Sequence, residues 1–393
     1  MTKQNEKDAK RVPELRFKGF TDDWEQRKLG DIGETFSGLS GKNKNDFGHG
    51  DASFITYMNV FSNSIADLRG TEHVEIDSKQ NQVMYGDILF TTSSETPEEV
   101  GMSSVWLGQI KNTYLNSFCF GYRILEKQNF DSYYMAYLLR AENFRKRMTV
   151  LAQGISRYNI SKKQVMNTFV NFPTMKEQRK IGKTLFLIDR TITLHEEQHR
   201  QLERLKKALL QKMFADETGY PALRFKGFTE KWEQSYLKDI ASVNSGRDYK
   251  HLNKGNIPVY GTGGYMLSVD KALSNTKDGI GIGRKGTINN PYILKAPFWT
   301  VDTLFYVIPY NVDLNFLYGI FQKIDWRKKD ESTGVPSLSK ENINKTKFKI
   351  PAISEQKEIG TIFQNLDTLI TLHQHKIDNL KRLKRALLQK MFV

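Results

Sequence analysis

The chain has 393 residues, and its 59 lysines and arginines against 44 aspartates and glutamates give a formal charge of +15. This length predicts two or three domains with sizeable cores, and 39% hydrophobic residues exclude a disordered chain. No apolar run of about 18 residues is present, so no membrane span is expected. The opening segment MTKQNEKDAK lacks the apolar stretch of a secretory signal, and the single cysteine, Cys119, excludes an internal disulfide. We therefore expect a reduced, cytoplasmic protein whose positive charge favours a polyanionic partner.

Two segments of the sequence occur twice. Residues 13–32 (PELRFKGFTDDWEQRKLGDI) resemble residues 221–240 (PALRFKGFTEKWEQSYLKDI), and residues 173–215 resemble residues 351–393. The stretches between them diverge almost completely. The chain is therefore one module written twice. We call the four similar segments the repeated frame and the divergent stretches, about 33–172 and 241–350, the two bodies.

The two bodies are expected to be α/β or mainly β, because aromatic and β-branched residues dominate short runs that Gly, Asn and Asp punctuate. A helix is expected after the strands of each body. In chain order the predicted elements are strands at 86–91 and 116–125, a helix near 132–147, strands at 257–260, 280–283 and 303–308, and a helix near 315–327.

The segments 173–215 and 351–393 are each expected to form one long helix, because neither contains a proline after its first residue. About 40 residues correspond to a rod of roughly 60 Å. Apolar or semi-apolar residues recur at alternating steps of four and three, which is typical of a coiled-coil seam. The simplest partner of each seam is the other copy in the same chain; the alternative is that each helix packs on its own body. The predicted seam consists of Ile181, Leu185, Ile188, Ile192, His195, Leu202, Leu209, Ile359, Phe363, Leu366, Ile370, His373, Ile377, Leu380 and Leu387.

This arrangement resembles the specificity (S) subunit of type I restriction-modification systems. The resemblance covers essentially the whole chain: both copies of LRFKGFT..WEQ..L.DI resemble the start of that family's target recognition domains. Residues 153–163 (QGISRYNISKK) and 332–340 (STGVPSLSK), each followed by Pro and EQ..IG, resemble the junction into its spacer helices.

The resemblance implies an α+β fold with two similar α/β target recognition domains, separated and joined by two long antiparallel coiled-coil helices with a pseudo-twofold repeat. The expected domains are residues 1–172 and 216–350, with spacer helices at 173–215 and 351–393. It also implies a bipartite double-stranded DNA target, two methyltransferase (M) subunits and restriction (R) subunits as partners. S-adenosylmethionine is expected on the M subunits, which methylate adenine N6. No catalytic, cofactor-binding or metal-binding residue is expected in this chain.

Candidate DNA-binding residues are polar or cationic side chains in loops beside the predicted strands and at the junctions, since cations bind phosphates and arginine and asparagine read base edges. In the first body they are Lys42, Lys44, Asn45, Ser93, Ser94, Arg157, Tyr158 and Asn159. In the second body they are Arg247, Tyr249, Lys250, Tyr260, Thr262, Arg284, Lys285, Thr287 and Ser337.

Three short motifs favour other classes of protein. Residues 195–199 match H-E-x-x-H of zinc hydrolases, but both histidines fall on the apolar stripe and the second copy lacks the glutamate. Residues 281–286 match G-x-G-x-x-G of dinucleotide-binding proteins, but turn residues follow where a helix is needed. Residues 289–292 (NNPY) resemble an adenine methyltransferase motif without its proline in the second place. The alternatives are thus a self-contained DNA methyltransferase, a zinc hydrolase, or a coiled-coil protein scaffold.

Overall fold

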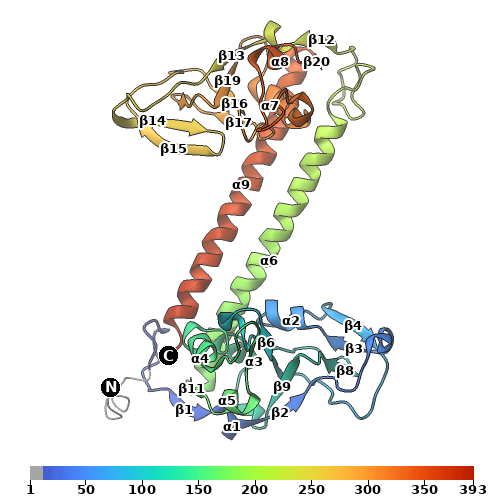
Figure 1. Cartoon of the computed structure of the whole chain (residues 1–393), viewed down its shortest axis with the longest axis vertical. Coiled ribbons are helices and arrows are strands. Elements are labelled where there is room, and N and C mark those ends of the chain that lie inside the picture. The colour runs from blue at the N-terminus through green and yellow to red at the C-terminus, as the bar shows by residue number, and fades with distance from the viewer. Residues whose placement is uncertain (1–11) are drawn as a thin grey trace. The chain divides into compact units, whose positions relative to one another are not determined.

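A computed structural model describes residues 12–393 of the chain. These residues fall into two compact units. Unit 1 combines the residues up to Leu194 with Lys376–Val393, and unit 2 consists of His195–His375. Each unit therefore contains one body and part of both long helices (Figure 1). The domain boundaries predicted from the sequence give each helix a segment of its own, whereas the two units divide both helices.

The body of unit 1 is built on two small sheets. The four-stranded sheet has the antiparallel order β2-β9-β5-β7, and the three-stranded sheet has the order β4-β3-β8 with β3 and β8 parallel. The bounds are β2 Gly33–Ser37, β9 Cys119–Ile124, β5 Ile88–Thr91, β7 Ser103–Val105, β4 Thr71–Val74, β3 Phe47–Ile55 and β8 Thr113–Leu115. The strands predicted at 86–91 and 116–125 are confirmed as β5 and β9.

Short helices surround these sheets. The helix predicted near 132–147 is in fact two helices, because the backbone becomes extended at Ala141, while the neighbouring Arg140 guanidinium donates to main-chain carbonyls of Val60, Asn63 and Ser103. The bounds are α1 Leu29–Ile32, α2 Tyr57–Ser62, α3 Ser132–Leu138, α4 Glu142–Leu151 and α5 Lys162–Met166. Short 3₁₀ turns in the two bodies are η1 Lys44–Asp46, η2 Pro97–Glu99, η3 Lys127–Asn129, η4 Leu237–Asp239 and η5 Trp326–Lys329.

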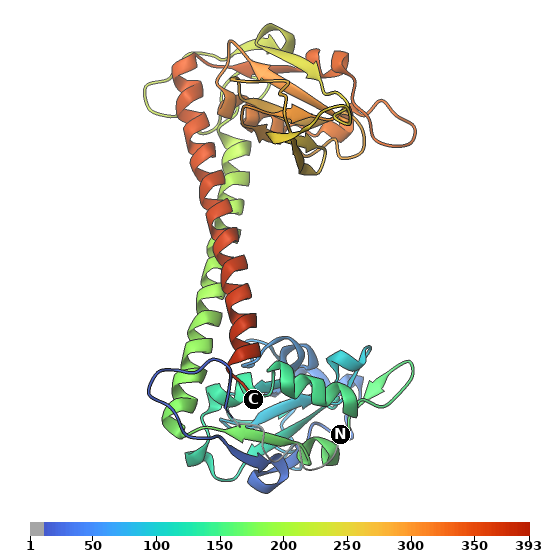
Figure 2. The same ribbon diagram turned by 90° about the vertical axis from the view of Figure 1, so that its left-hand side faces the viewer.

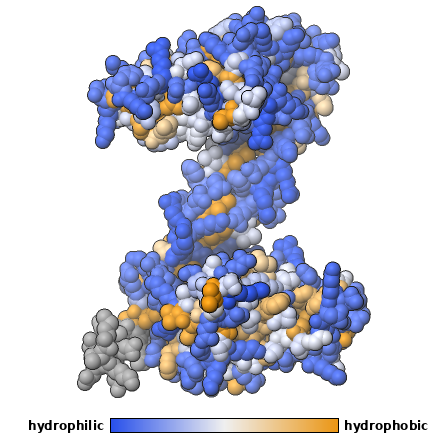
Figure 3. Space-filling model, in the orientation of Figure 1, coloured by the Kyte–Doolittle hydropathy of each residue, from blue (hydrophilic) through white to orange (hydrophobic). Residues whose placement is uncertain are grey.

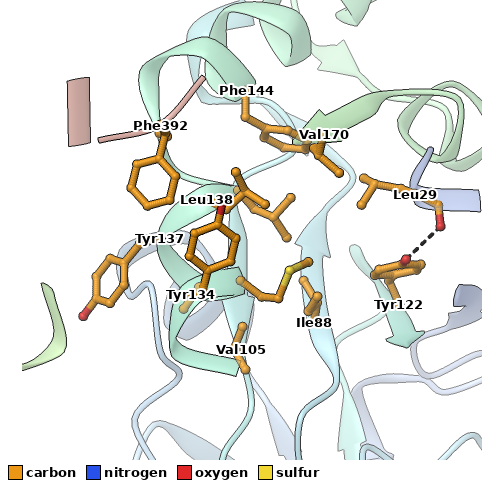
Figure 4. Packing of buried hydrophobic residues seen from close by; sticks show 14 of the residues in the cluster. Leu29, Ile88, Val105, Tyr122, Tyr134, Tyr137, Leu138, Phe144, Val170 and Phe392 are labelled. Atoms are coloured by element: carbon orange, nitrogen blue, oxygen red, sulfur yellow. Dashed lines mark hydrogen bonds between the residues drawn. The ribbon is translucent and has the colours of Figure 1, made fainter. Parts of the chain in front are cut away.

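The core of unit 1 lies between the four-stranded sheet and α3. Figure 4 shows Ile88 and Val105 of the sheet facing Tyr134 and Leu138 of α3, with Phe392 from the other end of the chain beside them. The buried Tyr122 hydroxyl donates to the carbonyl oxygen of Leu29 at 2.8 Å. Burial of large apolar side chains from the strands, α3 and the chain's last residues stabilises the unit.

Unit 2 has the same topology as unit 1 although the bodies share almost no sequence. Its sheets have the orders β13-β19-β16-β17 and β15-β14-β18, the latter again with one parallel pair. The bounds are β13 Ala241–Ser245, β19 Leu304–Pro309, β16 Gly279–Gly283, β17 Tyr292–Leu294, β15 Gly264–Val269, β14 Lys254–Gly261, β18 Trp299–Thr300, α7 Leu314–Lys323 and α8 Lys340–Asn344. The strands predicted at 257–260, 280–283 and 303–308 and the helix near 315–327 are confirmed as β14, β16, β19 and α7.

The repeated frame makes the same contacts in both units. In unit 1, β1 (Glu25–Lys28) pairs antiparallel with β11 (Phe169–Phe172), and in unit 2, β12 (Glu233–Tyr236) pairs with β20 (Lys347–Ile350) in the same way. The Arg16 guanidinium donates two hydrogen bonds to the fully buried Glu177 carboxylate at 2.7 and 2.8 Å, and Arg224 binds Glu355 likewise. A bidentate pair of this kind fixes the lead-in against the start of the long helix.

The repeated EQ..IG motif has a structural explanation in these contacts. Its glutamine, Gln178 in unit 1, accepts the Asp131 backbone N–H at 3.0 Å and donates to the Pro173 carbonyl oxygen at 3.0 Å. Its glycine, Gly182, allows α3 to approach, since a Cβ there would lie 2.4 Å from the Tyr134 nitrogen. The equivalents Gln356 and Gly360 make the same contacts in unit 2. The motif therefore serves folding of the frame.

The two long helices are α6 (Met175–Lys212) and α9 (Ile353–Lys390). They pair antiparallel: in unit 1, Lys384 Nζ lies 2.6 Å from an Asp189 carboxylate oxygen, and in unit 2, Lys206 pairs with Asp367. These reciprocal ion pairs explain why a lysine interrupts the apolar stripe at the same place in each helix.

The predicted seam residues are all buried or half-buried. The seam is not purely interhelical, however. Ile181 and Leu185 belong to the core of unit 1, and Ile359, Phe363 and Leu366 belong to the core of unit 2. At the start of each helix the alternative, packing on the helix's own body, therefore applies, because the stripe faces α3 or α7 there.

The ion pair between Lys206 and Asp367 provides a test of this helix pairing. We expect Asp367→Lys to lower the free energy of unfolding by about 1 kcal/mol, because it places two cations in contact at a partly buried position. The double variant Lys206→Asp with Asp367→Lys should recover most of that loss in urea denaturation. Arg69→Ala, at an exposed ion pair of unit 1, is the matched control with little effect. Equal losses in the single and double variants would contradict the pairing.

Candidate nucleic-acid interface

The structure brings together five of the candidate residues of unit 1. Residues 153–160 form a hairpin, which we call the junction hairpin, closed by two backbone hydrogen bonds of 2.9 and 2.8 Å between Gln153 and Asn159. Its returning strand β10 (Tyr158–Asn159) pairs antiparallel with β6 (Ser93–Ser94). Arg157, Tyr158 and Asn159 therefore lie beside Ser93 and Ser94, at the end of the central strand β5.

Unit 2 has a matching arrangement at the end of its strand β16. Residues 330–338, which we call the junction loop, bring Ser337 opposite Lys285 in an antiparallel bridge. The Leu338 N–H donates to the Arg284 carbonyl oxygen at 2.9 Å. The Asp330 carboxylate organises the loop by accepting the N–H groups of Ser337 and Ser332, and these hydrogen bonds lower the pKa of Asp330.

The hydrogen bonds establish which residues are equivalent in the two units. The Ile160 N–H donates to Thr92 O at 3.0 Å, just as Leu338 donates to Arg284. Thr92 and Ser93 of unit 1 thus occupy the positions of Arg284 and Lys285 in unit 2. The same two scaffold positions carry small hydroxyl side chains in unit 1 and exposed cations in unit 2. Such a difference changes what each edge can bind without changing the fold.

The two serines of unit 1 are less accessible than expected. Ser93 and Ser94 are 4% and 5% exposed, and the Ser94 hydroxyl donates to the Thr96 carbonyl oxygen. Their contact with DNA stays a prediction, and their burial shows that the side chains do not project from the surface. A position directly after a strand could be identified from the sequence, but the direction of the side chain depends on the pairing with β10.

A hollow of about 310 Å³ opens beside these serines. Three aromatic side chains line it: Tyr57, whose hydroxyl donates to Ser93 O at 2.6 Å, Phe61, and the half-exposed Phe118. The Arg157 guanidinium lies over the Phe118 ring at 5.8 Å from its centroid. Met58, Glu95 and Glu99 complete the lining. Flat apolar surfaces next to donors and acceptors suit a base edge better than a phosphate.

Sequence reasoning missed the aromatic residues of this hollow and Thr92. Tyr57 belongs to α2 and Phe118 to the turn before β9, so only the fold brings them to the junction hairpin. The one available signal was Phe118 itself, an aromatic residue in a polar turn next to a strand.

The loop cations of unit 1 lie on a different part of the body. Lys42 Nζ is 2.9 Å from an Asp77 carboxylate oxygen; this hydrogen bond raises the pKa of Lys42 and lowers that of Asp77 to about 2. Lys42 is therefore a loop cation that is paired within the body, and its contact with DNA stays a prediction. Lys44 and Asn45 are exposed in η1, where the Asn43 side chain caps the turn.

The remaining candidates of unit 2 are distributed over the three-stranded sheet and nearby loops. Arg247, Lys250 and Thr287 are exposed. Tyr249 is half-buried against the core of that sheet, and Tyr260 packs between the rings of Tyr265 and Tyr292. Thr262 is half-exposed at the turn between β14 and β15. Of these, Thr287 directly follows Gly286, whose N–H donates to the Pro336 carbonyl oxygen of the junction loop.

The motifs at 195–199, 281–286 and 289–292 do not lie in the structural context that zinc, dinucleotide or methyltransferase chemistry requires. His195 Nδ1 lies 3.0 Å from Nδ1 of His373 across the helix pair, and His199 lies 3.6 Å from Glu203 on its own helix. Residues 281–286 comprise the end of β16 and the start of the turn that leads to β17, with no helix N-terminus for a pyrophosphate. The Asn289 side chain accepts the Trp326 N–H at 2.7 Å and so stabilises the fold. In residues 12–393, no cluster of three or more His, Cys, Asp or Glu side chains could hold a metal ion.

Comparison with known proteins identifies the family. The family described as "Type I restriction modification DNA specificity domain" matches residues 21–204 and 229–382, and the chain belongs to this family. Two similar proteins come from Methanocaldococcus jannaschii. The putative type I restriction enzyme MjaX specificity subunit is 24% identical over 404 residues, covering 93% of this chain and 92% of that protein. The type I restriction enzyme MjaVIII specificity subunit is 22% identical over 424 residues, covering 96% and 92%.

The fold is also that of a solved specificity subunit. The crystal structure of the type I restriction-modification S subunit from M. genitalium superposes with a TM-score of 0.72 at 18% identity, covering 97% of this chain and 99% of that one. The resemblance seen in the sequence is confirmed: the chain is a DNA sequence-specificity subunit of a type I restriction-modification system. None of the helices within residues 12–393 has the length and apolar character needed to cross a bilayer.

The exposed cations beside the junction loop can be tested separately. We expect Arg284→Ala to weaken binding of the specific duplex by about 1–3 kcal/mol and to relax selectivity at one base pair, as loss of a base contact does. Lys285→Ala should instead weaken binding to all sequences and reduce the salt dependence by about one phosphate contact. Fluorescence anisotropy over a range of salt concentrations measures both. Lys328→Ala, exposed on η5, is the control, and variants indistinguishable from it would exclude this edge from the interface.

Proposed function

We propose that this chain is the non-catalytic reader of a bipartite DNA target. Each unit docks one edge into the major groove of one half-site. This junction edge is the junction hairpin with the end of β5 in unit 1, and the junction loop with the end of β16 in unit 2. Two M subunits, which bind S-adenosylmethionine, use this reading to methylate an adenine N6 in each half-site, and R subunits add cleavage. No cofactor is assigned to this chain. The assembly converts recognition by one subunit into chemistry by another.

The observation that carries this proposal is the pair of equivalent edges with different side chains. The frame and the topology are the same in both units, but Thr92 and Ser93 stand where unit 2 has Arg284 and Lys285. Two readers of unlike sequences need a common scaffold and unlike contact surfaces. A catalytic protein or a protein-binding scaffold gives no reason for that combination.

The repeated frame supports docking of two copies of one partner. Frame sequences are nearly the same in the two units, and similar surfaces bind identical subunits. Exposed leucines of the long helices give such a surface an apolar component. They are Leu187, Leu194, Leu205, Leu369, Leu372 and Leu383. Figure 3 shows apolar side chains among polar ones along the long helices. We assign this face of the helices to the M subunits.

We assign to the helix pair the role of fixing how many unspecified base pairs lie between the half-sites. Each of the two helices has 38 residues and contributes to both units. Because α-helices are stiff along their axis, a paired set of helices resists changes in length. The helix pair therefore acts as the spacer of the two readers.

Exchange of one body tests the proposed function most directly. Replacing residues 33–172 by the corresponding body of another family member should change the sequence of one half-site and leave the other half-site and the gap intact. Methylome sequencing of cells that carry the chimaera with its M subunits measures all three. A simultaneous change in both half-sites would contradict modular reading, and an unchanged target would exclude the first body as a reader.

A further inference from the structure

The junction segment of each body carries an exposed aliphatic side chain at its tip. Ile155, at the tip of the junction hairpin, is 96% exposed, and Val335, in the junction loop, is 66% exposed. Each directly follows a glycine, Gly154 or Gly334. Figure 2 shows both segments projecting from their bodies. Neither side chain is part of a hydrophobic core cluster of the described residues.

The geometry of the hairpin keeps Ile155 in this position. Gly154 has a φ of +142°, and a Cβ there would lie 2.0 Å from the Arg157 carbonyl oxygen, so only glycine allows so tight a tip. A single exposed apolar side chain on a protein surface is common. Two of them, one in the junction segment of each body in bodies that otherwise diverge, indicate a shared task.

The neighbours of the tips favour DNA over protein as the contact. Arg157 and Asn159, both exposed, follow Ile155 on the same hairpin. Val335 precedes Ser337, which pairs with Lys285, and Arg284 lies next to it. An exposed apolar side chain with a cation close to it suits insertion between base pairs, because the cation can bind a phosphate while the apolar group enters the stack.

We propose that Ile155 and Val335 are apolar wedges that enter the base stack, one in each half-site. This inference rests on the proposed function and adds a mechanism to it. An M subunit must take its target adenine out of the helix before the methyl group can reach N6. A wedge that separates a neighbouring base step offsets part of the lost stacking, so each unit prepares the base as well as locating it.

The test uses the complete assembly of this chain with its M subunits and a duplex in which 2-aminopurine replaces each half-site base in turn. Apart from the flipped adenine itself, bound wild-type protein should raise the fluorescence at one neighbouring step in each half-site, because unstacking relieves quenching. Ile155→Ser should abolish the rise in the first half-site only, and Val335→Ser in the second only. Ile155→Leu keeps the wedge and should keep the signal. Val150→Ser, at an 83% exposed position of α4, is the control.

Methylation rates measured separately for the two adenines give a second readout. Ile155→Ser should slow methylation in the first half-site about tenfold and leave the second unchanged. Selective duplex binding with unaltered 2-aminopurine signals in Ile155→Ser would overturn the wedge and leave the proposed function intact. Weaker binding of M subunits by Ile155→Ser without DNA would show a protein contact and would also overturn it. Absence of selective binding by the wild-type assembly would overturn the proposed function together with the wedge.

Discussion

The structure depends on the antiparallel pairing of two helices that come from the two halves of the sequence. Each unit is completed by the end of a long helix that comes from the other half of the chain. In unit 1 Phe392, which follows α9, packs beside Tyr134 of α3. In unit 2 Phe214, which follows α6, packs in the same way on Phe316 of α7. Folding of each unit and pairing of the helices are therefore one process, since the same side chains serve both.

This coupling separates the residues that must be kept from those that are free to change. The buried pairs of Arg16 with Glu177 and of Arg224 with Glu355, and the glycines at the helix starts, belong to the frame. Removing one partner of a buried pair leaves an uncompensated charge. By contrast, the side chains at the ends of β5 and β16 take no part in the frame. A new specificity can thus arise there by substitution in one body while assembly and stability are preserved.

Much of this architecture could be predicted from the sequence because it is repeated or periodic. Two copies of the frame, two heptad stripes and several strands are local patterns, and the structure has them. The sequence could not show where the apolar stripe contacts the helix's own body instead of the other helix. Ile181 looks the same in the sequence whether it faces α9 or α3. The site was accessible only in part. Arg157 and Lys285 could be named as candidates from their loops. Tyr57 and Phe118, by contrast, come together only through the sheet topology, and the ion pair of Lys42 with Asp77 joins separate loops.

The central claim is that the paired helices set the gap between two independent readers. It is tested most directly by inserting one heptad into both α6 and α9, next to the pair of His195 and His373, and mapping methylated adenines in cells that contain the M subunits. Seven residues add about 10 Å to each helix while keeping the apolar stripes in register. The account predicts a modified target with both half-site sequences unchanged and a longer gap. Methylation at the original spacing would contradict it.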